Sequence, residues 1–179
     1  MHPRHALRHL AIGLRFSKAA AVLCSSNLLV DDFSRFSNRR NNLGLKASDD
    51  GSMTSISVLG DSISFTPRPM SYFYETVPCV DAEASGYEAL AFTIKAPQDA
   101  SITLEMQTME NCSVEAYNST WRYVMNFTGE PQRIVAPVSS FRGARTSGIA
   151  AFNWATWESQ STGFVWELGD VELVCGATS

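Results

Sequence analysis

The sequence predicts an all-β protein whose antiparallel strands form a sandwich or a barrel. Three observations lead to this expectation: short runs alternate apolar and polar side chains, turns rich in Gly, Pro and Asn separate these runs, and no 3.6-residue period is sustained. Several short strands at such spacing are typical of sandwiches and barrels. The length of 179 residues suits one domain with a sizeable core.

The last expected strand, Phe164–Cys175, shows the alternation most clearly. Its inward residues are Phe164, Trp166 and Leu168, followed by Val171, Leu173 and Cys175. The phase changes between these two sets, and one extra residue at Gly169-Asp170 keeps both facing the core, which predicts a β-bulge. The run 28–33 is the expected partner of this closing strand.

The other expected strands lie between these two and are all short. They are Met53–Leu59, Ser62–Thr66, Ser71–Val77, Ala89–Lys95, Ser101–Thr108, Trp121–Phe127, Gln132–Val138 and Ile149–Trp154. Clusters of Asn, Asp, Gly and Ser between residues 31 and 52 predict a loop-rich connection after the first strand.

Residues 1–27 differ from the rest of the chain and are expected to lie outside the domain formed by residues 28–179. This leader holds four basic residues and no acid, which fits a secretory signal, a transit peptide or a misassigned start codon. Residues 28–179 then carry a net charge of −8, which disfavours nucleic acid as a partner. No run of about 18 apolar residues predicts a membrane span.

Two kinds of modification favour secretion. Three N-glycosylation acceptors begin at Asn111, Asn118 and Asn126. Four cysteines suit an oxidising compartment, and we expect a disulfide between Cys79 and Cys112, which border strand-like runs. Cys24 could join Cys175 if it survives processing; four reduced thiols remain the alternative.

Histidine-based catalysis is not expected in the domain. All three histidines, His2, His5 and His9, lie in the leader, so residues 28–179 cannot form a Ser-His or Cys-His pair or a histidine metal site. An enzyme using two carboxylates remains an alternative, with Glu105 and Glu167 as acids on strands. Outward acids on strands are also simply solvated, and we name no catalytic residue.

Aromatic side chains are the candidates for ligand binding, because the apolar faces of sugar rings stack on exposed rings. The candidates are Trp157, Trp121, Tyr72 and Tyr74. Trp157 lies in a polar segment, 155–163, where contact with a ligand and packing over the end of the sandwich are equal alternatives. Trp121 begins a strand, and the two tyrosines share a strand face, where cross-strand pairing is the alternative. Trp166 is expected in the core.

Four aspartates are the candidates for a structural calcium site: Asp31, Asp32, Asp170 and Asp50. If the first and last strands pair, several of their oxygens could converge, as calcium requires. Turn formation and capping are the alternative roles of each aspartate.

Several short motifs in order make the chain resemble fungal galactose-binding-like jelly-roll modules, which bind carbohydrate. The motifs are Asp31-Asp32-Phe33, Asn42-Leu43-Gly44, Asp49-Asp50-Gly51-Ser52-Met53, Phe73-Tyr74-Glu75, Cys79, Glu105-Met106-Gln107-Thr108, Cys112, Pro137-Val138-Ser139-Ser140-Phe141 and Trp166-Glu167-Leu168-Gly169-Asp170-Val171. Similar modules occur alone or attached to polysaccharide deacetylases.

The resemblance covers residues 28–175 and implies an antiparallel β-sandwich of the jelly-roll type with neighbouring first and last strands. It also implies calcium near those strand ends and sugar binding at end loops or on a concave sheet face. Binding residues vary among such modules, so Trp157 and Trp121 rest on their expected exposure alone.

The sequence therefore predicts a secreted, monomeric, non-catalytic protein that binds cell-wall polysaccharide. A carboxylate-based polysaccharide-active enzyme and a secreted interaction protein without a sugar ligand are the alternatives.

Overall fold

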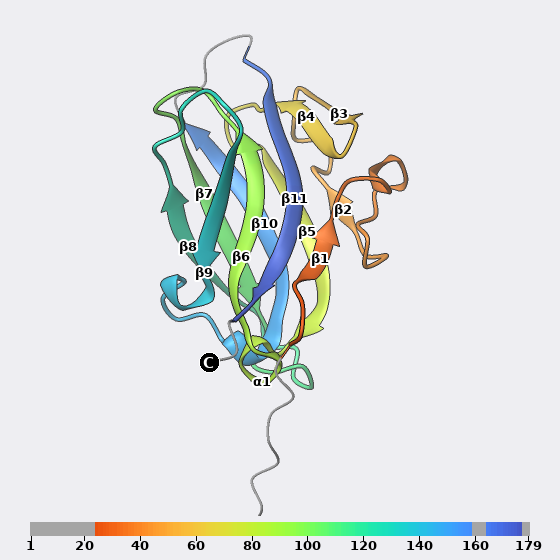
Figure 1. Ribbon diagram of the computed structural model, residues 1–179, viewed down its shortest axis with the longest axis vertical. Coiled ribbons are helices and arrows are strands. Elements are labelled where there is room, and N and C mark those ends of the chain that lie inside the picture. The colour runs from red at the N-terminus through yellow and green to blue at the C-terminus, as the bar shows by residue number, and fades with distance from the viewer. Residues whose placement is uncertain (1–23, 159–163, 177–179) are drawn as a thin grey trace, which may run out of the picture.

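Two antiparallel β-sheets pack face to face in the computed structural model, which describes residues 24–158 and 164–176 (Figure 1). The first sheet has the strand order β3-β4-β11-β6-β9, with β1 also paired to β11, and the second has the order β2-β5-β10-β7-β8. The expected antiparallel β-sandwich is thus confirmed. Residues 1–23 of the expected leader lie outside the described part of the chain.

The strands have the following bounds. The first sheet contains β1 (Leu28–Asp31), β3 (Ser55–Leu59), β4 (Ser62–Thr66), β6 (Tyr87–Lys95), β9 (Gln132–Pro137) and β11 (Trp166–Cys175). The second sheet contains β2 (Ala47–Ser48), β5 (Tyr72–Val80), β7 (Ser101–Thr108), β8 (Asn118–Val124) and β10 (Ile149–Glu158). One short helix, α1 (Ala82–Ser85), and three single 3-10 turns complete the described elements, and among these no helix is long and apolar enough to cross a membrane.

The first and last strands pair as expected. Strand β1 runs antiparallel to β11, with Leu28 opposite Leu173. The register of β11 against β6 shifts between Gly169 and Glu172, and Asp170 has a positive φ of 49°, so the predicted bulge is present. A Cβ added at Gly169 would lie 3.2 Å from the Cβ of Ser62 on the neighbouring strand, a tight contact.

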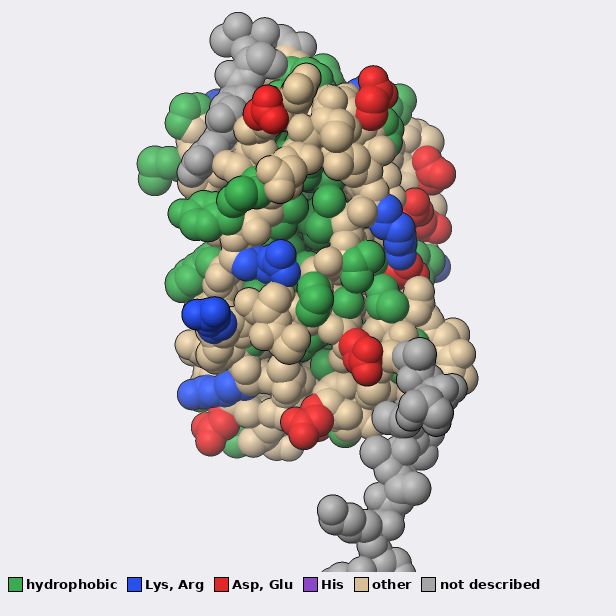
Figure 2. All heavy atoms as spheres, turned by 60° about the vertical axis from the view of Figure 1, so that its left-hand side comes forward, with side chains coloured by type: hydrophobic (Ala, Val, Ile, Leu, Met, Phe, Trp, Pro, Cys, Tyr) green, Lys and Arg blue, Asp and Glu red, His purple; other side chains and the backbone are tan. Residues whose placement is uncertain are grey.

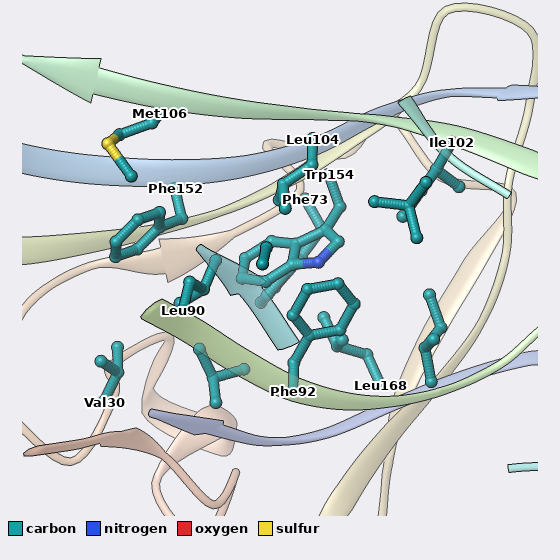
Figure 3. Close-up of a cluster of buried hydrophobic side chains, with 14 of the residues drawn as sticks. Val30, Phe73, Leu90, Phe92, Ile102, Leu104, Met106, Phe152, Trp154 and Leu168 are labelled. Carbon is teal, nitrogen blue, oxygen red and sulfur yellow. The ribbon is translucent and has the colours of Figure 1, made fainter. Parts of the chain in front are cut away.

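The inward residues of both sheets form one continuous core. Figure 3 shows Trp154 of β10 enclosed by Phe73 and Phe92, which come from opposite sheets. The Trp154 and Phe92 rings meet edge to face at 5.4 Å, a favourable aromatic arrangement. Trp166 is 1% exposed, which confirms its expected place in the core.

Two disulfides are present. Cys79–Cys112 links the end of β5 to the loop after β7, as expected, and Cys24–Cys175 joins the start of the described chain to the end of β11. The alternative of four reduced thiols is therefore wrong for this structure.

Candidate functional site

The outer face of the second sheet gathers polar and aromatic side chains from four adjacent strands, and we call it the aromatic face. Strand register arranges its central residues in three rows across β5, β10, β7 and β8. The rows are Tyr72, Ala155, Thr103, Tyr123; then Tyr74, Asn153, Glu105, Trp121; then Thr76, Ala151, Gln107, Ser119. The alternate residues of the central strands, such as Phe73, Phe152 and Leu104, are buried in the core, so the three rows face outward.

Aromatic rings border this face on two sides. Tyr72 and Tyr74 stand on β5, and Trp121 and Tyr123, which are 60% and 61% exposed, stand on β8. Two strands separate the two borders, a span of roughly 14 Å at the usual strand spacing. Figure 2 brings the side of β8 and β9 forward and shows hydrophobic side chains reaching the surface among polar ones.

Short and polar side chains form the floor between the two borders. Asn153 donates from Nδ2 to Glu105 Oε2 at 2.9 Å. Ala151 and Ala155 on β10 have short side chains, so they rise less above the sheet than the aromatic rings at the borders. The Oδ1 atom of Asn153 is buried and has no hydrogen-bond partner within the described part of the chain. The floor therefore offers hydrogen-bonding groups between aromatic walls, the combination that holds a sugar ring.

A hollow of about 280 Å³ lies over the third row of this floor. Tyr74 lines one side of it, and Tyr117 and Glu115, from the loop before β8, line another. The Cys79–Cys112 disulfide ties that loop to β5 and so holds this wall against the sheet. The hollow thus has a rigid border contributed by residues far apart in the sequence.

A small network supports the tyrosine border. Asp50 Oδ1 accepts hydrogen bonds from Lys46 Nζ at 2.9 Å and from the Tyr74 hydroxyl at 3.3 Å, and Asp50 Oδ2 accepts one from the Tyr72 hydroxyl at 3.4 Å. The Lys46 hydrogen bond is the main reason why the pKa of Asp50 is lowered. The Lys46 ammonium also lies 5.3 Å from the centre of the Tyr74 ring, a cation–π distance.

The structure corrects the expected position of Trp157. Strand β10 continues to Glu158, so Trp157 is a strand residue that is only 4% exposed, and its indole Nε1 donates to the carbonyl of Ser71 at 3.1 Å. Its ring packs 5.0 Å from those of Phe65 and Trp166. Trp157 therefore belongs to the core and offers no stacking surface; residues 159–163 of the expected loop lie outside the described residues.

The four candidate calcium ligands have different surroundings in the structure. Asp31 is buried beside Glu75, Asp50 pairs with Lys46, and Asp32 accepts the backbone N–H of Ser34. Asp170 lies exposed on the bulge, over the outer face of the first sheet. Among the described residues, no three His, Cys, Asp or Glu side chains form a metal-binding group.

The two acids considered for catalysis are also separated. Glu105 lies on the aromatic face, whereas Glu167 lies on β11 of the other sheet and pairs with Lys95 at 3.1 Å. Sheets pack about 10 Å apart and these side chains point away from each other, so their carboxyl groups lie beyond both the separation of about 5 Å and that of about 6.5–9.5 Å used by pairs of catalytic acids.

The three expected glycosylation acceptors lie near the β8 edge. Asn126 is exposed after β8, whereas Asn111 and Asn118 are half-buried. Asn118 donates from Nδ2 to the carbonyl of Gly143 at 3.1 Å, and Asn111 Oδ1 accepts the backbone N–H of Ser113 at 2.8 Å. Asn126 is therefore the most accessible of the three.

Of the four expected ligand-binding aromatics, the structure brings Tyr72, Tyr74 and Trp121 together on one face. Sequence reasoning missed Tyr117, Tyr123 and Asn153. Tyr123 follows Trp121 by two residues, so strand alternation alone could have placed it on the same face. Asn153 and Tyr117 had no such signal, because they join the face only through strand order and a disulfide-bound loop.

Comparison with known proteins finds the same sandwich fold in solved carbohydrate-binding modules. No protein-family description matches the sequence, and no curated protein does. The chain is similar to a family 11 carbohydrate-binding module from Clostridium thermocellum, solved in complex with a β-1,3-1,4-mixed-linked tetrasaccharide. That similarity has a TM-score of 0.57 and 14% identity, over 86% of this chain and 98% of the module.

Two further solved structures share the architecture. A family 30 carbohydrate-binding module from a cellulosomal cellulase of Clostridium thermocellum has a TM-score of 0.52 at 11% identity, over 72% of this chain and 91% of the module. A family 29 module solved with mannohexaose has a TM-score of 0.50 at 13% identity, over 87% and 94% of the two chains. At such identities the likeness establishes the sandwich fold alone.

Proposed function

We propose that this protein is a non-catalytic carbohydrate-binding module that holds a polysaccharide chain on its aromatic face. The observation that carries the proposal is the second row of this face, in which Tyr74 and Trp121 flank the hydrogen-bonded pair Asn153 and Glu105. Stacking on the rings would supply affinity, and the polar floor would orient the hydroxyl groups.

The width of the face supports a polymer over a single sugar. The two aromatic borders are roughly 14 Å apart, so one hexose ring cannot contact both. A ligand that uses Tyr74 and Trp121 together must therefore contain several linked sugars. The solved modules with the same sandwich include complexes with a tetrasaccharide and with mannohexaose, which are ligands of this kind.

Secretion, a monomeric state and recognition of cell-wall polysaccharide belong to the same proposal. Two disulfides and three N-glycosylation acceptors favour an oxidising compartment. The lack of histidine in residues 28–179 and the separation of Glu105 from Glu167 favour binding without hydrolysis.

Affinity electrophoresis and calorimetry with mixed-linked β-glucan, glucomannan, cellulose and chitin test the proposal. We expect Trp121→Ala to weaken binding about tenfold, as loss of a central aromatic contact does. Val135→Ala is the matched control, because Val135 is an exposed apolar residue on the first sheet. Wild-type protein that binds no glycan, or equal binding by both variants, would contradict the proposal.

A further inference from the structure

The inference concerns Glu105, which is the only charged side chain among the three rows of the aromatic face. Its Oε2 atom accepts the hydrogen bond from Asn153, and within the described part of the chain it has no ion-pair partner. An unpaired carboxylate in the middle of a binding surface biases the charge of the ligand that the surface accepts.

Glu105 and Trp121 are directly opposite each other on β7 and β8. Cross-strand neighbours have Cβ atoms about 5 Å apart, so a carboxylate stands beside an exposed indole ring. Both groups attract a cation, the carboxylate by its charge and the indole by its π face. A neutral hydroxyl group can satisfy only the hydrogen-bonding part of this environment.

At the tyrosine border on β5, a carboxylate and an aromatic ring also lie close together, and there a lysine of the protein supplies the cation. There Asp50 holds Lys46, whose ammonium lies 5.3 Å from the centre of the Tyr74 ring. At the β8 border, the nearby cationic side chain Arg122 is turned away, since it donates to Ser140 and lies over the Phe141 ring. The described residues therefore place no protein cation between Glu105 and Trp121.

We infer that the aromatic face selects polysaccharides that carry free amino groups, with a ligand ammonium seated between Glu105 and Trp121. This inference rests on the proposed function, because it assumes that the same face binds the sugar chain. Glucosamine-type polymers are then the class with the highest affinity for the aromatic face. Uronic-acid polymers have the lowest affinity, because Glu105 repels their carboxylates.

Two soluble ligands isolate the amino group: the β-1,4-linked glucosamine tetramer and cellotetraose, which carries hydroxyl groups in its place. Calorimetry with the full chain at pH 6 should show a preference of about fivefold to tenfold for the amine. The preference should shrink in 0.5 M salt, which screens exposed charges. Equal affinities for the two tetramers at low salt would overturn the inference.

Two charge-removing variants separate the local effect from the acidity of the whole protein. Glu105→Gln keeps an acceptor for Asn153 and should bring the ratio of the two affinities, glucosamine tetramer over cellotetraose, down to about one. Asp170→Asn removes one charge from the other sheet and should preserve the preference. Equal losses in both variants would overturn the inference, whereas failure of wild-type protein to bind either tetramer or any polysaccharide would instead contradict the proposed function.

Discussion

Asp31 of β1 and Glu75 of β5 place their carboxyl groups within hydrogen-bonding reach of each other, although both residues are fully buried. The two strands belong to different sheets, so this pair links the layers of the sandwich. Asn41 donates from Nδ2 to Glu75 Oε2 at 3.0 Å, and the Phe33 N–H donates to Asp31 Oδ1 at 2.7 Å. The other two carboxyl oxygens have no donor among the described residues, which fits a proton held between them.

This pair predicts that stability falls as the pH rises. Burial raises the pKa of Asp31 to about 6, and burial together with Asp31 raises the pKa of Glu75 well above its ordinary value. The folded state therefore holds protons that the unfolded state releases near pH 4, so stability is greatest below about pH 4 with respect to this pair and declines through pH 6. Urea unfolding between pH 4 and 8 should show a loss on the order of 2 kcal/mol.

Glu75→Gln tests the origin of that decline. The glutamine amide can donate to Asp31 and accept from Asn41, so it replaces the shared proton by a permanent hydrogen bond. We expect the free energy of unfolding to depend less steeply on pH across the same range, because Glu75 no longer titrates while burial still raises the pKa of Asp31. Glu83→Gln, on the exposed helix α1, is the control and should keep the wild-type slope; a Glu75→Gln profile parallel to wild type would exclude the pair as the cause.

The burial of Trp157 predicts that its loss affects stability and leaves sugar binding intact. Trp157→Ala removes a buried ring that contacts Phe65 and Trp166 and should cost about 3–5 kcal/mol. Thermal unfolding should shift down by about 10 °C. Trp121→Ala should show the reverse, weak binding with an unfolding free energy within about 0.5 kcal/mol of wild type. Lost glycan binding by folded Trp157→Ala protein would return Trp157 to the candidate site.

The two disulfides should differ in their effect on binding. The double variant Cys79→Ser, Cys112→Ser removes a bond between residues 33 apart in the sequence and should lower the free energy of unfolding by about 4 kcal/mol. It should also weaken glycan binding, because it frees the loop that carries Tyr117. The double variant Cys24→Ser, Cys175→Ser removes a bond between residues 151 apart in the sequence and should lower the free energy of unfolding by about 5 kcal/mol. The affinity for glycan should not change, since this bond lies away from the aromatic face. Calorimetry on each folded variant distinguishes the two; equal affinities would show that the loop needs no tether.

The β11 bulge predicts a specific intolerance. Gly169→Ala would bring a Cβ to 3.2 Å from that of Ser62 and to 3.3 Å from the carbonyl oxygen of Asp61, so we expect a loss of about 1–3 kcal/mol. Asp170→Asn should be tolerated within about 0.5 kcal/mol, because asparagine accepts the positive φ of this position. Denaturant midpoints measure both, and a stable Gly169→Ala protein would mean that β4 moves aside.

The sequence by itself determined the all-β class and the bulge, which follow from alternation of side chains and from turn residues, both local properties of the chain. The pairing of the first and last strands and the Cys79–Cys112 bond were expected from the sequence, and the structure confirms both. The same alternation placed Tyr72 with Tyr74 on one strand face. It failed at Trp157, where a polar segment concealed the continuation of β10.

Only the tertiary structure decided where a ligand could bind. Tyr74, Asn153, Glu105 and Trp121 form one row because β5, β10, β7 and β8 are neighbours in that order, and strand order depends on long-range pairing that local pattern does not encode. The same is true of Asp31 and Glu75, whose raised pKa values arise from two separate strands meeting in the interior. Side-chain direction is set by the alternation along a strand, but the identity of each neighbour is set by the packing of the whole chain.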